Sequence, residues 1–197
     1  MAWERVRGVS LENEFVQLRP IEAGDIEQFR SIAFEPEIWR YFVFHIASEE
    51  DLAKFIQSSI NDRAAGVRVA LAIIARQANR IAGSMSFGNM AEPDGRLEIG
   101  WSWLGRDFRG TRINKWSKYL MLAYAFEELA CERVEFKTDA LNVRARKGLL
   151  KIGAKEEGTL RSYNLMPDNR RRDAVYYSIL KQEWPHVKGM LLNGEGR

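Results

Sequence analysis

The chain has 197 residues, of which 46% are hydrophobic and 29% charged, a composition typical of one globular domain with its own core. Thirty basic residues against 27 acidic ones give a net charge of +3, a mixed surface that argues against nucleic-acid binding. The sequence has no apolar run long enough for a membrane span, and residues 1–10 lack the apolar segment of a secretory signal, so we expect a cytoplasmic protein.

The first third of the chain is predicted to hold one strand and three helical segments. Apolar Phe15 and Leu18 before Pro20 predict the strand. Asp25 is a good N-cap residue, an aromatic-rich stretch follows it, and Ser48 starts an acidic capping sequence. The expected elements are a strand at 15–19, a helix opening at Asp25, a short helical piece at 35–44 and a helix from Ser48 to about Gly66.

The rest of the chain alternates between strands and helices. An apolar run after Gly66 predicts a buried strand, and a stripe of apolar residues at helical spacing predicts a long helix after loop 105–112. The expected strands are 68–75, 81–87, 96–104, 134–138, 157–164 and 172–180, and the expected helices are 113–130, 142–150 and 183–192. This order predicts an α/β fold in which helices cover the faces of a mixed sheet.

The strand at 96–104 alternates between apolar and other residues, as a strand with two different faces does. We expect Leu97, Ile99, Trp101 and Trp103 on one side of the sheet, and Glu98, Gly100 and Ser102 on the other.

The loop that joins this strand to the long helix has the features of a phosphate site. A glycine at position 110 permits close backbone approach, and the first amides of a helix favour negative charge. Arg109 and Arg112 can add charge-assisted hydrogen bonds to phosphate oxygens. Taken alone, this spacing predicts only a phosphate-binding loop.

An ordered set of motifs extends over nearly the whole chain. It consists of Leu18-Arg-Pro20, Glu98-Ile-Gly-Trp-Ser-Trp-Leu104, Arg109-Gly-Thr-Arg-Ile-Asn114, Lys118-Tyr-Leu-Met-Leu-Ala-Tyr-Ala-Phe-Glu127, Val134-Glu-Phe-Lys-Thr-Asp-Ala-Leu-Asn142 and Leu150-Lys-Ile-Gly-Ala-Lys-Glu-Glu-Gly158. In this set the sequence resembles the Gcn5-related N-acetyltransferase (GNAT) superfamily, and within it the branch of ribosomal-protein acetyltransferases.

The resemblance implies the GNAT fold, a mixed and mostly antiparallel sheet with helices on both faces. Two parallel strands, here 96–104 and 134–138, would splay apart. One N-acetyltransferase domain would cover residues 1–197. Its parts would be the first strand and acceptor-side helices at 14–65, the coenzyme-binding core at 67–181 and a tail helix at 183–192.

The resemblance also implies acetyl-CoA as co-substrate. Its pantetheine arm would pair with the backbone of the splayed strand, its pyrophosphate would rest on the loop amides, and basic residues of the following helix would reach the adenosine phosphates. The coenzyme-binding residues expected on this basis are Trp101, Trp103, Leu104, Arg109, Gly110, Thr111, Arg112, Ile113, Asn114, Asn142, Arg146 and Lys147.

One window departs from the family's usual pattern. The pyrophosphate loop is usually Gln/Arg-x-x-Gly-x-Gly/Ala, whereas here Asp107 and Arg112 stand at its first and last positions. Either Arg112 points outward and binds phosphate, or it obstructs the loop.

Acetyl transfer to an amine needs a base near the amine. Glu98 corresponds to a position where many relatives carry a catalytic glutamate, although a structural role in a pair with an arginine such as Arg96 is an equal alternative. Candidate donors to the departing thiolate are Ser102, Tyr119 and Asn142. Trp39, Phe42 and His45 are expected to line the acceptor pocket, although aromatic clusters are more often plain core.

The predicted function is transfer of an acetyl group to a primary amine by direct attack in a ternary complex, with a protein N-terminus as one acceptor. A small-molecule acceptor (an amino acid, polyamine or amino sugar) and a coenzyme-binding module without turnover are the alternatives. The single cysteine, Cys131, forms no internal disulfide, and no Cys/His cluster predicts a metal. The tail after Trp184 is expected to cover an edge strand, within the chain or in a homodimer.

Overall fold

The computed structural model describes residues 2–194, so Met1 and residues 195–197 of the predicted domain lie outside the described range. Eight strands form one sheet in the order β1-β2-β3-β4-β5-β6-β8-β7. All neighbouring strands are antiparallel except β5 and β6, which are parallel. The prediction of a mixed, mostly antiparallel sheet with one parallel pair is confirmed.

The strands are β1 (Leu11–Glu12), β2 (Val16–Pro20), β3 (Arg68–Ala75), β4 (Arg80–Ala91), β5 (Arg96–Leu104), β6 (Arg133–Asp139), β7 (Lys155–Leu165) and β8 (Arg171–Leu180). The α-helices are α1 (Ile26–Ala33), α2 (Pro36–Trp39), α3 (Glu49–Ala65), α4 (Ile113–Ala123), α5 (Val143–Lys151) and α6 (Trp184–Asn193). Shorter helical segments of other types are η1 (Ala2–Gly8), η2 (Ala23–Asp25), η3 (Glu92–Asp94), η4 (Arg106–Phe108), η5 (Tyr124–Glu128) and η6 (Lys181–Glu183).

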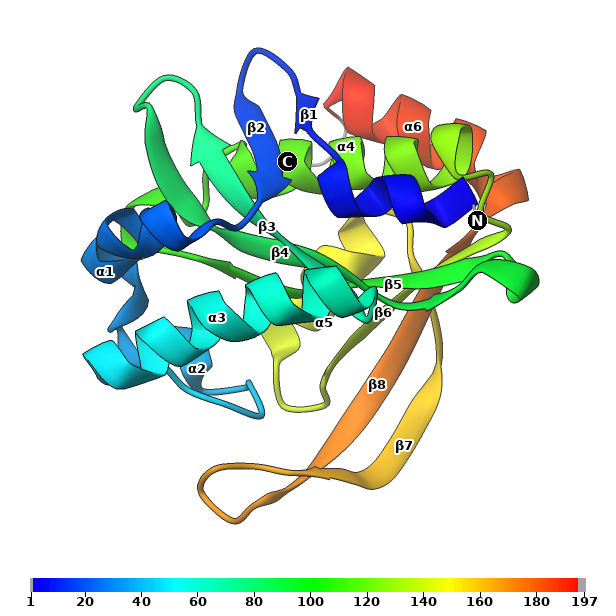
Figure 1. Ribbon diagram of the computed structural model, residues 1–197. Helices are drawn as coiled ribbons and strands as arrows, with labels where there is room; N and C mark the ends of the chain where they lie inside the picture. The colour runs from blue at the N-terminus through cyan, green and yellow to red at the C-terminus, as the bar shows by residue number, and fades with distance from the viewer. Residues whose placement is uncertain (1, 195–197) are drawn as a thin grey trace.

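Helices cover both faces of the sheet, as predicted. Figure 1 shows η1, α4 and α6 above the sheet and α1, α2 and α3 below it. The upper core joins residues of all these layers, including Leu97, Met121 and Phe136. The lower core contains aromatic residues of α1 and α3, here Phe29 and Phe55. The hairpin of β7 and β8 projects beyond both layers (Figure 1).

The N-terminal segment and α2 differ from the sequence prediction. The prediction missed η1 and β1, which are held by buried contacts such as the hydrogen bond from Trp3 Nε1 to the Leu129 carbonyl, 3.0 Å. Such a long-range contact leaves no periodic signal in the sequence. The predicted helical piece at 35–44 is wrong after Trp39, because the aromatic residues that follow pack on one another in an irregular segment instead of on one helical stripe.

The long helix runs nearly as far as predicted but changes its geometry. It is α-helical to Ala123 and continues as a π turn through Glu128. The Leu129 N–H then donates to the Tyr124 carbonyl at 3.0 Å, and Ala130 has a φ of 54°, which ends the helix. Apolar spacing alone does not distinguish a π turn from an α turn.

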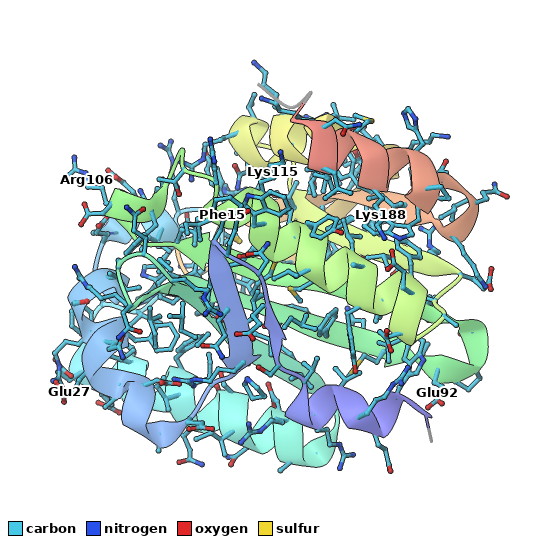
Figure 2. All side chains as sticks on the ribbon, turned by 90° about the horizontal axis from the view of Figure 1, so that it is seen from above. Phe15, Glu27, Glu92, Arg106, Lys115 and Lys188 are labelled. Carbon is cyan, nitrogen blue, oxygen red and sulfur yellow. The ribbon has the colours of Figure 1, made fainter. Side chains whose placement is uncertain are left out.

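The C-terminal helix packs on α4, so the prediction that the tail covers an edge strand is wrong. The Trp184 ring stacks on Phe126 with centroids 5.5 Å apart, and its Nε1 donates to Glu127 at 2.7 Å. Lys188, labelled in Figure 2, pairs with the same carboxylate at 2.8 Å. No helix within residues 2–194 is long and apolar enough to cross a bilayer.

Candidate active site

The two parallel strands separate after a short stretch of pairing. Arg96, Leu97 and Glu98 of β5 pair with residues 133–135 of β6, and then the pairing ends. Yet β5 continues to Leu104 and β6 to Asp139. An opening therefore forms between the ends of two neighbouring strands, which is the splay that the resemblance implied.

A β-bulge interrupts β5 beside this opening. Ser84 of β4 pairs with Trp103 and Ser86 pairs with Gly100, so β5 carries one extra residue here. Trp101 has a φ of 50°, a strained value for a bulky residue. The bulge reverses the alternation of side chains along the strand.

The bulge makes the predicted alternation wrong at the two tryptophans. Trp103 lies on the lower face, away from Leu97 and Ile99, and its ring is 5.6 Å from that of Phe29. Trp101 instead points to a cavity, where the Arg68 guanidinium lies 5.5 Å from its ring centroid. Gly88 leaves room for this ring, since a Cβ there would lie 2.6 Å from it.

Glu98 is buried at the base of the opening, with 3% of its surface exposed. Asn89 Nδ2 donates to its Oε2 at 2.7 Å, and Lys137 Nζ of β6 lies 3.6 Å from the same oxygen. Gly100 is needed beside it, since a Cβ at that position would lie 2.9 Å from Oε1. The expected structural partner, Arg96, pairs with Asp94 and Glu135 instead of with Glu98.

The glycine loop ends in an exposed turn at the start of α4. Gly110 has a φ of 73°, and a Cβ there would meet open space. The Thr111 hydroxyl donates to the Phe108 carbonyl at 2.7 Å and accepts from the Ile113 N–H at 3.3 Å, which shapes the turn. The first amides of a helix have no partner within it, so this turn presents donors suited to a phosphate.

The arginines of the loop take different positions. Arg109 is tied down, since its Nε donates to the Leu104 carbonyl at 3.0 Å and its Nη2 lies 3.2 Å from Glu35. Arg112 points outward and lies over the Phe15 ring, 5.6 Å from its centroid, so it does not obstruct the loop. Figure 2 shows Phe15 beside the start of α4, near Lys115. Asp107 is exposed.

The remaining expected coenzyme residues lie on α4 and α5. Asn142 caps α5 as predicted, accepting from the Ala145 N–H at 3.1 Å. Arg146 is held by the Tyr177 hydroxyl at 3.1 Å and by Glu156 at 3.3 Å, whereas Lys147 is exposed. Ser102 Oγ lies 3.4 Å from the Gly100 carbonyl, beside the bulge.

Two other candidate side chains on α4 point elsewhere or along the helix. The Tyr119 ring lies 6.2 Å from that of Trp184, so it faces α6 rather than β5. Asn114 Oδ1 accepts from Lys118 Nζ at 2.8 Å, one turn further along α4.

Burial lowers the pKa of Lys118 to about 8, and this shift predicts a pH-dependent cost. The folded state loses the proton before the unfolded chain does, so stability rises as pH increases from about 8 to 10.5. We expect Lys118→Met to raise the free energy of unfolding at pH 7 by about 1–2 kcal/mol, a discounted value for a half-buried group. Urea unfolding at pH 7 and at about pH 10 measures it, and an equal gain at both pH values contradicts it.

A cavity of about 580 Å³ lies on the side of the bulge away from α4. Of the three residues expected to line the acceptor pocket, only His45 lines it. Trp39 is buried among Phe42, Phe44 and Trp103, which makes it part of the aromatic core. The cavity is lined by Phe44, His45, Ile46, Asp51, Lys54, Phe55, Ser58, Asp62, Val67, Arg68, Asn89 and Trp101.

Three residues of this site were missed from the sequence: Arg68, Asn89 and Lys137. Each contacts a residue that was named, either Trp101 or Glu98. The buried carboxylate was itself a usable signal, because a buried charge is usually paired or hydrogen-bonded. The sequence does not say which strand supplies the partner.

An opening between parallel strands, a phosphate-suited turn at one end and a buried carboxylate beside a cavity at the other define an N-acetyltransferase. The model for the Acetyltransferase (GNAT) domain matches residues 16–155. The chain therefore belongs to the GNAT acetyltransferase family, whose members normally use acetyl-CoA, and it is an acyltransferase.

Known relatives agree with this assignment. The chain is 27% identical over 180 residues to the "Putative ribosomal N-acetyltransferase YdaF" of Bacillus subtilis, covering 89% of this chain and 97% of that protein. It is 34% identical to an acetyltransferase structure from T. thermophilus, with a TM-score of 0.85 and coverage of 94% and 96%. The ribosomal-protein-S5-alanine acetyltransferase of Vibrio fischeri shares the fold, with a TM-score of 0.71, 17% identity and coverage of 89% and 98%.

Proposed function

We propose that this chain transfers an acetyl group from acetyl-CoA to a primary amine, by direct attack within a ternary complex. The observation that carries the proposal is the position of the opening between β5 and β6. It lies between the turn at Gly110 and the buried Glu98, so donor and acceptor can approach β5 from opposite sides.

On the donor side, the backbone of residues 101–104 and the amides of the turn would hold acetyl-CoA. The bound donor supplies an activated thioester carbonyl. Arg112 is the outward cation of the loop and Lys147 the exposed cation of α5, so they are the proposed phosphate contacts. Arg109 would act indirectly by fixing the loop to Leu104 and Glu35.

On the acceptor side, Glu98 would accept the proton of the attacking amine, directly or through a water molecule. Its hydrogen bond from Asn89, a residue of the cavity wall, connects the carboxylate to the acceptor pocket. Ser102 and backbone N–H groups of the bulge would donate to the developing charge on the donor.

Direct attack predicts that the single cysteine has no part in the reaction. Cys131 is fully buried, and burial raises the pKa of its thiol to about 12, so it is almost entirely protonated at neutral pH. We expect Cys131→Ala to keep turnover within about two-fold, and the native thiol to resist alkylation until the chain unfolds. Turnover assays and mass spectrometry after iodoacetamide check this. A trapped acetyl-cysteine would overturn direct attack.

The proposed acceptor is a protein N-terminus, supported by the ribosomal names that relatives carry. The test is a panel of N-terminal peptides, amino acids, polyamines and amino sugars, with release of free CoA thiol as the readout. Peptide turnover supports the proposal, whereas turnover of small amines alone moves the acceptor to that class. Acetyl-CoA binding without turnover of any amine contradicts the enzyme. A cytoplasmic location and a homodimer remain predictions.

A further inference from the structure

The Arg172 side chain is buried and incompletely partnered. Only 7% of its surface is exposed. Its Nη1 lies 3.4 Å from the Tyr41 carbonyl, and its buried Nε has no hydrogen-bond partner among the described residues. Buried guanidinium groups are normally paired with a carboxylate or another acceptor. An arginine in this state therefore has unused capacity to bind an anionic or carbonyl oxygen.

Arg172 lies on the acceptor side of the sheet, at the splayed end of β6. Ala174 of β8 pairs with Asp139, the last residue of β6, and Arg172 lies two residues beyond that pair on the same face. Tyr41, its contact, belongs to the segment that leads to the cavity residues Phe44 and His45. This position places Arg172 beside the acceptor pocket rather than the donor turn.

The charges around Arg172 do not balance. Asp139 is already paired with Arg170 at 2.6 Å, and Glu98 has Lys137 at 3.6 Å. Both carboxylates act on Arg172 electrostatically, raising its pKa against the stronger effect of burial. Three cations thus share two carboxylates, and Arg172 is the cation left without a close carboxylate among the described residues.

We propose that Arg172 binds a carboxylate carried by the amine acceptor, which rests on the proposed function and narrows its substrate class. A guanidinium accepts a carboxylate in a two-hydrogen-bond geometry, and Nε with one Nη can form such a pair. The acceptor's amine would lie at Glu98 while its carboxylate lies at Arg172. The carboxylate could come from a free amino acid or from the side chain of an acidic residue at a peptide N-terminus.

The test compares matched acceptors that differ only in the carboxylate. One arm uses free amino acids against their amides, and the other uses peptides that begin with Asp or Glu against those that begin with Asn or Gln. We expect kcat/KM of the wild type to favour the carboxylate member of at least one arm by about 10- to 100-fold, the usual range for a charge-assisted hydrogen bond. The arm that shows the preference identifies the source of the carboxylate.

Arg172→Gln should collapse this preference to about three-fold or less, mainly through a higher KM for the carboxylate acceptor. Arg171→Gln is the matched control, because Arg171 contacts Ser162 of the β7–β8 hairpin and should keep the preference. If Arg172→Gln does not fold, Arg172→Lys gives the answer, since it keeps the charge without the fork and should lower the preference partly.

Two results overturn the inference. A wild type that turns over amides and carboxylates equally leaves the acetyltransferase intact but removes the role of Arg172. A preference that survives both Arg172 variants does the same. Failure of every amine in the panel is different, because it contradicts the proposed function itself.

Discussion

Glu98→Gln is expected to lower kcat for acetyl transfer by roughly 10²- to 10⁴-fold, the usual contribution of a general base. The amide keeps the size of the side chain and can still accept from Asn89, so the fold should be retained. It cannot take a proton from the attacking amine. We expect acetyl-CoA affinity to change less than about three-fold, because Glu98 is proposed to act on the acceptor.

The pH profile separates a base from a structural glutamate. If Glu98 is the base, its loss removes the acidic limb of kcat/KM as well as the rate. Glu135→Gln is the matched control, since Glu135 pairs directly with Glu98 across β5 and β6 but contacts Arg96 and Arg133. It should keep kcat within about two-fold. Full activity of Glu98→Gln across the pH range would remove the base assignment.

Local signals in the sequence were enough to locate the site's framework. The strand at 96–104, the turn at Gly110 and the cap at Asn142 all lie where periodicity and capping residues placed them. These features depend on neighbours in sequence, which propensity and pattern report directly. Glu98 was named for a related reason, as a charged residue in an otherwise apolar strand.

The features that were missed depend on contacts between distant segments. The bulge at Trp101 leaves the Trp-Ser-Trp alternation unchanged in sequence, and only the pairing with β4 reveals the extra residue. The contact of Arg109 with Glu35 spans 74 residues, and that of Arg172 with Tyr41 spans 131. A motif shows which residue types are present, but the register of the sheet determines which of them meet.

Gly83→Ala is expected to destabilise the protein by about 3 kcal/mol, near the upper range for forcing an extra group into a packed core. Gly83 pairs with Leu104, and a Cβ there would lie 2.1 Å from the Trp103 carbonyl oxygen and 2.9 Å from Leu104 Cα. Both neighbours are backbone atoms, so β5 must move. For a chain of this size the melting temperature should fall by roughly 6–12 °C.

The same displacement should weaken acetyl-CoA binding, because residues 101–104 are the proposed donor-binding segment. Gly24→Ala is the matched control, since a Cβ there meets no atom within 4 Å and stability should change by less than about 0.5 kcal/mol. Urea unfolding and calorimetric titration with acetyl-CoA measure both effects. If Gly83→Ala loses stability but binds acetyl-CoA normally, the close approach of β4 is structural, and the donor does not depend on the position of β5.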